Sequence, residues 1–134
     1  MADRRIDAVM QTEFLRLRRE TPIREAVAKM VEAQAHAAPV VDDTGALIGI
    51  LSQKDCFRPA VHASYYQQWQ GTAGEYMNSN VVTLEAETDI VSAAEAFLEK
   101  PYRVFPVLRG GRLVGMLERT QLLAVFLQLS NDRQ

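Results

Sequence analysis

The sequence predicts an α+β fold built from two copies of a β-α-β-β-α unit, in which helices cover two small sheets. Two observations support this prediction. The second half of the chain repeats the first at an offset of 67 residues, the separation of Met10 and Met77. Within each half, short apolar runs alternate with segments of helical periodicity. The chain has only 134 residues, so the simplest expectation is one shared core.

The internal repeat extends through most of the chain. One residue is missing from a turn of the second copy, after which the offset becomes 66. Ordered matches of this kind indicate a duplicated structural unit. The identical pairs are Met10 and Met77, Leu17 and Leu84, Glu20 and Glu87, Thr21 and Thr88, Ile23 and Ile90, Ala26 and Ala93, Glu32 and Glu99, Pro39 and Pro106, Val40 and Val107, Gly45 and Gly111, Leu47 and Leu113, Gly49 and Gly115, and Leu51 and Leu117.

The first copy is expected to begin with a strand at residues 14–17. A helix should follow Thr21-Pro22, because a hydroxyl side chain caps helices and proline is favoured in the first turn. Val40-Val41 and residues 47–51 form apolar, β-branched-rich runs. The turn residues 42–46 between them predict a hairpin.

The second copy is expected to follow the same plan. Its first strand should cover residues 81–84, and a helix should run from Asp89 to about Glu99. The turn of its hairpin is tighter and is formed by Gly110-Gly111. A closing helix is expected from about residue 119 to residue 129.

The expected limits are 1–57 for the first repeat, 58–74 for a linker and 75–134 for the second repeat. Pro59, Gly71 and Gly74 mark breaks within the linker. Its aromatic run, residues 65–69, either covers the core or serves as a partner-binding surface.

Charge and composition exclude several classes. A net charge of -2 gives no basic field, so no nucleic-acid partner is expected, and the cluster of Arg16, Arg18 and Arg19 is short. No apolar stretch is long enough to insert into a membrane, and residues 1–5 lack the apolar core of a signal peptide. One cysteine, Cys56, and two histidines leave too few ligands for a structural zinc site. A reducing, cytoplasmic location is therefore expected.

Both copies also carry a valine or tyrosine before methionine (Val9-Met10, Tyr76-Met77) and a Pro-Val strand start (Pro39-Val40, Pro106-Val107). The first copy closes with Gly-Ile-Leu-Ser-Gln-Lys-Asp over residues 49–55. Over about residues 6–129 the chain resembles a tandem pair of CBS (cystathionine-β-synthase) domains, a Bateman module. The resemblance implies two repeats packed with pseudo-two-fold symmetry and an adenine nucleotide bound as a regulatory ligand between them. It further implies a homodimer and a protein target that reads the signal.

Ser52 and Asp55 stand three residues apart at a strand-to-helix junction, so their side chains share one face of the first turn. A carboxylate there can accept hydrogen bonds from ribose hydroxyls, and a helix N-terminus favours phosphate. The alternative is that either residue only caps the helix. Under the ribose interpretation, Asp55→Ala should abolish nucleotide binding and leave the thermal midpoint nearly unchanged.

The resemblance assigns the remaining site residues. The adenine is expected against Ala37, Ala38 and Pro39 and against the first strand, Phe14 to Arg16. The phosphate is expected at Arg103, with Arg119 as a second candidate, because the guanidinium fork can donate two hydrogen bonds at once. The alternative for Arg103 is a plain surface charge. Arg16 replaces the small hydroxyl residue of many relatives.

The second copy has Glu-Arg-Thr-Gln over residues 118–121, where the family pattern has Ser/Thr-x-x-Asp. A glutamine offers no charged acceptor, so the sequence predicts one working site per chain, built around Asp55.

No nucleophile with its base and no pair of tuned carboxylates stands at convincing spacing, so no enzyme activity and no cofactor are expected. Cys56 is interpreted as a core residue, and His36 either lines the second pocket or lies at the surface. The dimer contact is expected among Val27, Val31, Leu98 and Leu122. Two alternatives remain: an interaction scaffold without a ligand, and a sensor of another adenosyl ligand such as S-adenosylmethionine.

Overall fold

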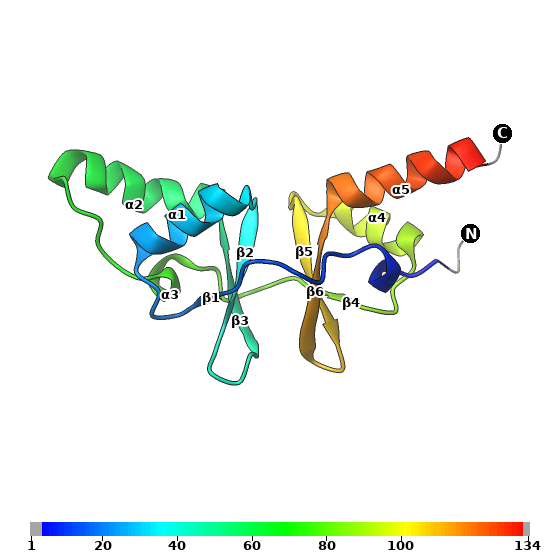
Figure 1. The fold of residues 1–134 in the computed structure, drawn as a ribbon, viewed down its shortest axis with the longest axis horizontal. Helices are drawn as coiled ribbons and strands as arrows, with labels where there is room; N and C mark the ends of the chain where they lie inside the picture. The colour runs from blue at the N-terminus through cyan, green and yellow to red at the C-terminus, as the bar shows by residue number, and fades with distance from the viewer. Residues whose placement is uncertain (1–3, 133–134) are drawn as a thin grey trace. The chain divides into compact units, whose positions relative to one another are not determined.

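The computed structural model describes residues 4–132, so the outermost residues of both expected repeats lie outside it. The chain forms two compact units (Figure 1). The first-repeat unit is Leu15–Val81. The second-repeat unit combines the residues up to Phe14 with those from Val82 onward. The α+β class with two small sheets is confirmed.

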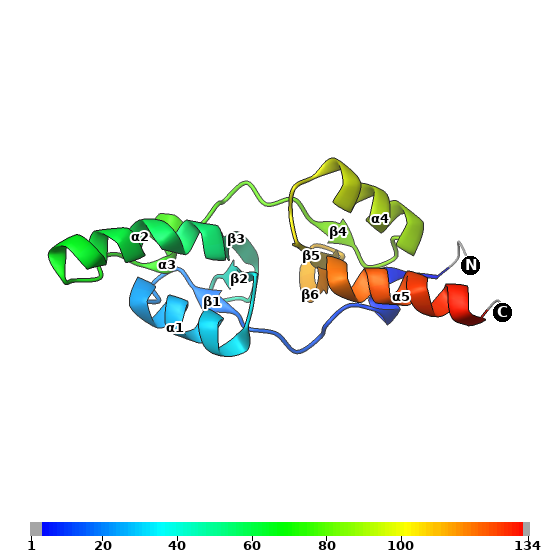
Figure 2. The same cartoon turned by 90° about the horizontal axis from the view of Figure 1, so that it is seen from above.

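The first-repeat unit contains a three-stranded sheet in the order β1-β2-β3. Strand β1 is parallel to β2, and β2 is antiparallel to β3. Figures 1 and 2 show helices α1 and α2 side by side against this sheet. The elements are β1 (Leu17–Arg18), α1 (Ile23–Ala33), β2 (Ala37–Val41), β3 (Leu47–Ser52), α2 (Gln53–Tyr66) and α3 (Ala73–Tyr76).

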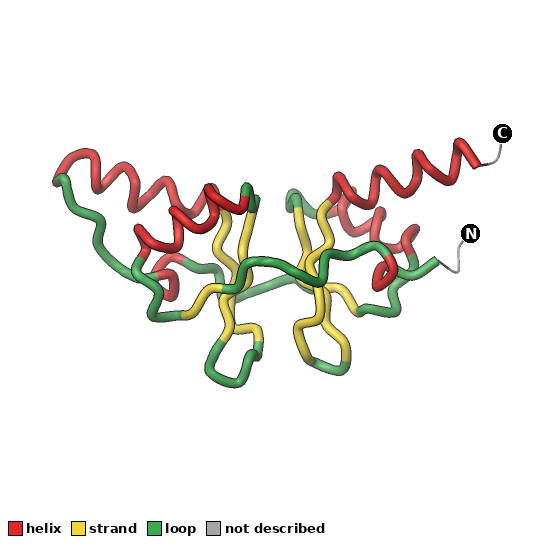
Figure 3. The backbone as a smooth tube through the Cα atoms, in the orientation of Figure 1, coloured by secondary structure: helices red, strands yellow, loops and turns green. Residues whose placement is uncertain are grey.

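The second-repeat unit repeats this plan with the sheet order β4-β5-β6. Helices α4 and α5 pack with this sheet in the second-repeat core, and a 3-10 turn near the beginning of the described residues belongs to the same unit. In Figure 3 the β2–β3 and β5–β6 hairpins of the two units are both visible as pairs of strands closed by a loop. The elements are η1 (Ile6–Ala8), β4 (Leu84–Glu85), α4 (Ile90–Glu99), β5 (Val104–Arg109), β6 (Arg112–Glu118) and α5 (Arg119–Asp132).

Several expected boundaries differ from those in the structure. The first strand of each repeat is two residues long and begins at Leu17 or Leu84, because each pairs with its neighbour over only two positions. Helix α2 continues through Tyr66, so part of the expected linker is helix. The aromatic run is divided: Trp69 packs on the core, whereas Tyr65 and Tyr66 are exposed.

The cap expected at Thr21 is wrong. The hydroxyl of Thr21 accepts a hydrogen bond from the backbone N–H of Arg18, 3.1 Å away, and so closes the turn that precedes the helix. Helix α1 starts one residue later, with Pro22 at the N-cap and no side-chain cap. The backbone N–H of Ile23 instead donates to the carbonyl of Gly71, so a distant segment satisfies the helix end.

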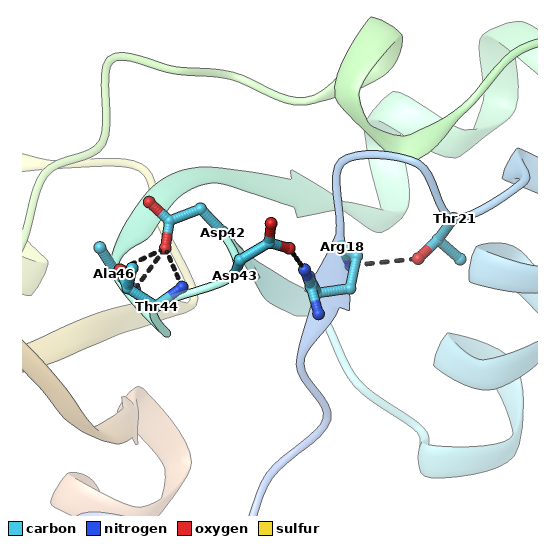
Figure 4. A network of polar contacts seen from close by, with 6 residues as sticks. All are labelled: Arg18, Thr21, Asp42, Asp43, Thr44 and Ala46. Carbon is cyan, nitrogen blue, oxygen red and sulfur yellow. Dashed lines mark hydrogen bonds and ion pairs between the residues drawn. The ribbon is translucent and has the colours of Figure 1, made fainter.

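The predicted turn of the first hairpin is confirmed and is held by one carboxylate (Figure 4). Oδ1 of Asp42 accepts hydrogen bonds from the hydroxyl and N–H of Thr44 and from the N–H of Ala46. These bonds, the hydroxyl of Thr44 first, hold the pKa of Asp42 below its usual value. Asp43 beside it pairs with Arg18 (Figure 4). Gly45 has a φ of 85°, as the turn requires.

The expectation of one shared core is wrong, because the buried apolar residues form two clusters, one in each unit. Each cluster is completed by a segment that precedes the other repeat in the sequence. Ile6, fully buried, lies in the second-repeat core, and its N–H donates to the carbonyl of Thr88. Ala73, also fully buried, lies in the first-repeat core, and its N–H donates to the carbonyl of Thr21.

A glycine in the second strand of each hairpin leaves room for the segment that completes the core. Ile50 forms two backbone hydrogen bonds with Asn78, at 2.9 and 2.8 Å, which brings Met77 directly over Gly49. A Cβ at Gly49 would lie 2.9 Å from Cγ of Met77 and 3.2 Å from the carbonyl oxygen of Asn78. Glycine at this position therefore admits another chain segment.

We expect Gly49→Ala to lower the free energy of unfolding by about 1–3 kcal/mol, because the added methyl group displaces Met77 and its backbone. Chemical denaturation measures this change. In a Met77→Ala background the cost should be smaller, since part of the obstruction is gone. An equal cost in both backgrounds would contradict the contact with the methionine.

Candidate functional site

The candidate site lies where strand β3 ends and helix α2 begins. Ser52 is the last residue of β3 and pairs across the hairpin with Ala37, the first residue of β2. Ser52 is also the N-cap of α2, and Asp55 is the third residue of that helix. The antiparallel register thus brings Ser52, Asp55 and Ala37 to one end of the sheet.

Ser52 and Asp55 form a reciprocal capping box. The backbone N–H and the hydroxyl of Ser52 both lie within hydrogen-bond distance of Oδ2 of Asp55, at 2.9 and 2.8 Å. The backbone N–H of Asp55 donates to the Ser52 hydroxyl oxygen at 3.2 Å. Both side chains are half-buried. The capping role considered from the sequence is therefore real and involves both residues.

The capping box uses only one of the two carboxylate oxygens of Asp55. Both bonds that Asp55 accepts end on Oδ2, and no described residue donates a hydrogen bond to Oδ1. A carboxylate oxygen has lone pairs for additional donors, and a charged acceptor forms stronger hydrogen bonds than a neutral one. Asp55 can therefore cap helix α2 through one oxygen and accept from a ligand through the other.

The three residues expected beside the adenine differ in accessibility. Ala37 is half-buried at the open end of the hairpin, beside Ser52. Ala38 and Pro39 are buried, and the methyl group of Ala38 belongs to the first-repeat core. Ala37 is therefore the member of this group whose side chain is open to a ligand.

Arg16 and Phe14, the other two residues expected beside the adenine, belong to different units. Arg16 is exposed and directly precedes β1. Because Leu17 pairs with Val40 in the parallel register, Arg16 lies opposite Pro39. Phe14 belongs to the second-repeat unit.

Arg103 and Arg119 come together within the second-repeat unit. Arg103 precedes β5, and Arg119 opens helix α5. The backbone N–H of Arg119 donates to the carbonyl of Arg103 at 3.0 Å, so two exposed guanidinium groups originate from adjacent backbone positions. The matching bond in the first repeat joins Gln53 N–H to the carbonyl of His36 at 2.9 Å. Arg103 and Arg119 therefore occupy the positions in the second repeat that His36 and Gln53 occupy in the first.

The second copy keeps the geometry of the junction without its charge. Oε1 of Gln121 accepts from the backbone N–H of Glu118 at 3.2 Å, in the same arrangement as Asp55 and Ser52. The neutral amide caps the helix but provides a weaker acceptor for a ligand.

Sequence reasoning missed the role of Gln53. Its side-chain Nε2 donates to the carbonyl oxygen of Ala35, 3.0 Å away, in the segment that leads into β2. The sequence gives no direct signal of this bond, because glutamine is common on exposed helix surfaces and its backbone partner lies 18 positions earlier.

The interpretation of Cys56 as a core residue is confirmed. It is buried beside Met30, and burial, followed by the charge of Asp55, raises the pKa of its thiol to about 11. The thiol is therefore protonated at neutral pH and is a poor nucleophile. Among the described residues, no group of three or more histidine, cysteine or acidic side chains could hold a metal ion. Within residues 4–132 no helix has both the length and the apolar character needed to cross a bilayer.

Curated relatives match most of the length of this chain. A CBS domain-containing protein of Dictyostelium discoideum is 26% identical over 92% of this chain and 92% of its own length. Two uncharacterized proteins of Methanocaldococcus jannaschii are 22% and 28% identical over 86% and 78% of this chain. The chain spans only 40% and 24% of the lengths of those two relatives.

Solved structures share the fold. CBSX2 of Arabidopsis thaliana, crystallised in complex with AMP, matches 95% of this chain and 98% of its own with a TM-score of 0.83 at 22% identity. The CBS domain pair of protein MJ0100, in complex with 5-methylthioadenosine and S-adenosyl-L-methionine, matches 92% of this chain and 96% of its own with a TM-score of 0.76 at 21% identity.

The model of the CBS domain family matches the chain twice, over residues 6–61 and 73–128. Each match combines one β-α-β-β-α unit with the methionine-bearing segment that precedes it in the sequence. The chain belongs to the CBS domain family and carries two copies of the domain.

Proposed function

We propose that this chain is a regulatory module that binds an adenine nucleotide at Asp55 and signals to a partner protein. The observation that supports it most is the free carboxylate oxygen. Asp55 is fixed by its capping box, yet its Oδ1 accepts no hydrogen bond from the described residues. Two ribose hydroxyls are suitable donors for such an oxygen, and the N-terminus of α2 favours the adjoining phosphate.

The solved relatives support the ligand class. CBSX2 was crystallised with AMP, and the MJ0100 domain pair with two adenosyl compounds. These ligands share adenine and a ribose ring with two free hydroxyls, which matches the proposed pairing of Asp55 with the ribose and of Ala37 with the base. The proposal therefore names AMP, ADP or ATP first and keeps S-adenosylmethionine as the alternative ligand.

One working site per chain remains part of the proposal. Gln121 stands where the first repeat has Asp55, and its single amide oxygen already accepts the bond from Glu118. A nucleotide at the junction of β6 and α5 would therefore have no charged acceptor for its ribose, which lowers the expected affinity there.

The capping box changes what replacement of Asp55 should do. Asp55→Ala should weaken AMP binding tenfold or more, because a hydrogen bond to a charged group contributes about 1.5–3 kcal/mol. The same substitution should lower the thermal midpoint by about 2–8 °C, because the helix cap is lost. This prediction replaces the nearly unchanged midpoint expected from the sequence, because the capping box gives Asp55 a part in holding the helix end. Isothermal titration with AMP, ADP, ATP and S-adenosylmethionine, with thermal unfolding alongside, measures both effects.

Asp89→Ala is the matched control. Asp89 caps α4 through hydrogen bonds from Ser92, and these bonds hold the pKa of its carboxyl below its usual value. Its replacement should lower the thermal midpoint and leave nucleotide affinity unchanged. Undiminished binding by Asp55→Ala would overturn the site. Failure of the wild-type protein to bind any of the four compounds would favour an interaction scaffold without a ligand.

The phosphate role of Arg103 and Arg119 is likewise a proposal. We expect Arg103→Ala to weaken AMP binding about tenfold or more and to leave adenosine binding unchanged, because adenosine has no phosphate for a guanidinium to bind. Parallel titrations with the two ligands test this expectation. Arg112→Ala, at the turn of the β5–β6 hairpin, serves as the control. Equal weakening of both ligands would exclude a phosphate role.

The homodimer belongs to the same proposal. Val31 on α1 and Leu98 on α4 occupy equivalent positions in the two repeats, and their exposed fractions are 70% and 86%. Exposed large apolar side chains mark an interface where they form a contiguous patch, and these two residues are the candidates for such a patch in a dimer. Of the other two residues considered for this contact, Leu122 is buried in the second-repeat core and Val27 packs against the first-repeat core.

We expect Val31→Glu and Leu98→Glu each to shift the protein from dimer to monomer, because each places a charge in the proposed interface. Light scattering during gel filtration gives the molar mass. Arg112→Glu, at a hairpin turn, should leave the mass unchanged. A monomeric wild-type protein, or variants that stay dimeric, would overturn this interface.

The module is proposed to act without catalysis, so an unidentified protein target must read the signal. The buried, protonated thiol of Cys56 agrees with this proposal. The absence of a nucleic-acid partner also remains a proposal, supported by the net charge of -2. A cytoplasmic location remains a proposal as well, based on the single cysteine.

A further inference from the structure

The short segment between α1 and β2, residues 34–36, is held by Gln53 at two points. The side-chain Nε2 of Gln53 donates to the carbonyl oxygen of Ala35 at 3.0 Å. Its backbone N–H donates to the carbonyl oxygen of His36 at 2.9 Å. Gln53 lies between Ser52 and Asp55, so the residue that fixes this segment belongs to the first turn of α2 at the candidate site.

The other side of the segment is joined to helix α1. Gln34 ends that helix in the left-handed conformation, with a φ of 53°. Its N–H donates to the carbonyl of Val31 at 3.1 Å, and the N–H of Ala35 donates to the carbonyl of Met30 at 3.0 Å. A continuous series of hydrogen bonds therefore links the first turn of α2 to the last turn of α1, which carries the exposed side chain of Val31.

The chemistry of the contact requires a long side chain with a donor. The carbonyl oxygen of Ala35 is an acceptor, so only the amide nitrogen of Gln53 can face it. Methionine has a similar length and no donor, whereas lysine has both the reach and a donor. These two substitutions separate the hydrogen bond from the length of the side chain.

We propose that Gln53 is a positioning residue that couples the nucleotide site to the C-terminal end of α1. This inference rests on the proposed function. A ligand that contacts both Asp55 and Ala37 joins the two elements that Gln53 already connects, so its binding restrains residues 34–36 and the last turn of α1. The surface at Val31, which the proposed function assigns to the homodimer contact, then differs between the free and the bound protein, so the ligand state reaches the second copy of the chain.

The experiment compares Gln53→Met, Gln53→Lys and the control Lys54→Met by amide hydrogen exchange and nucleotide titration. Lys54 is the exposed neighbour in the same helical turn. In the free protein, Gln53→Met should speed exchange of the Ala35 amide about three- to tenfold. Gln53→Lys should restore the wild-type rate, and Lys54→Met should not change it.

On addition of AMP, exchange at Val31 and Ala35 should slow in the wild type, in Gln53→Lys and in Lys54→Met. In Gln53→Met this response should be lost, and AMP should bind about three- to tenfold more weakly. Wild-type exchange and wild-type affinity in Gln53→Met would overturn the inference and leave the role of Asp55 intact.

The failure of the proposed function gives a different result. If the wild-type protein binds none of the nucleotides, the coupling fails together with that function. The two failures are distinguishable, because the first exchange measurement uses the free protein and depends only on the bond between Gln53 and Ala35.

Discussion

The close approach of a methionine-bearing segment to a strand glycine is the constraint on which both units depend. Met77 lies over Gly49 in the first repeat, and Met10 lies over Gly115 in the second. Each three-stranded sheet is too small to bury its own apolar face, so it needs a further layer. The segments around Ala73 and Ile6 supply buried side chains for that purpose. The second repeat therefore takes part of its core from the beginning of the chain, whereas the core of the first repeat comes from the continuous stretch Leu15–Val81.

The same packing determines the candidate site. The Asn78 segment pairs with Ile50 in β3, so the end of that strand is held two residues before Ser52. Ser52 and Asp55 then close the first turn of α2 by reciprocal hydrogen bonds. The carboxylate is thereby fixed through one oxygen before any ligand arrives. A preorganised acceptor of this kind loses little conformational freedom on binding, which favours affinity. Stability and the proposed binding therefore depend on one side chain, and a substitution at Asp55 has to be judged against a second cap such as Asp89.

Gln53 adds a link that a cap alone does not provide. Its side chain reaches Ala35, and that segment is hydrogen-bonded in turn to the last turn of α1. The corresponding backbone bond is present in the second repeat, between Arg119 and Arg103. The glutamine side chain is therefore a feature of the first repeat, the one that also has the charged acceptor. The proposed ligand site and the proposed coupling through Gln53 therefore lie in the same repeat.

The sequence by itself determined the duplication, the order of strands and helices, the hairpin turn at Asp42 and the junction at Ser52 and Asp55. These features follow from periodicity and local chemistry, which depend on residues close together in the chain. Only the tertiary structure decided that Ile6 and Ala73 complete separate cores, that Gly49 admits Met77 and that Gln53 binds Ala35. It also decided that the N–H of Ile23 is satisfied by Gly71 rather than by a cap at Thr21. Each of these contacts joins positions far apart in sequence, and periodicity indicates which face of an element is buried without identifying the segment that covers it.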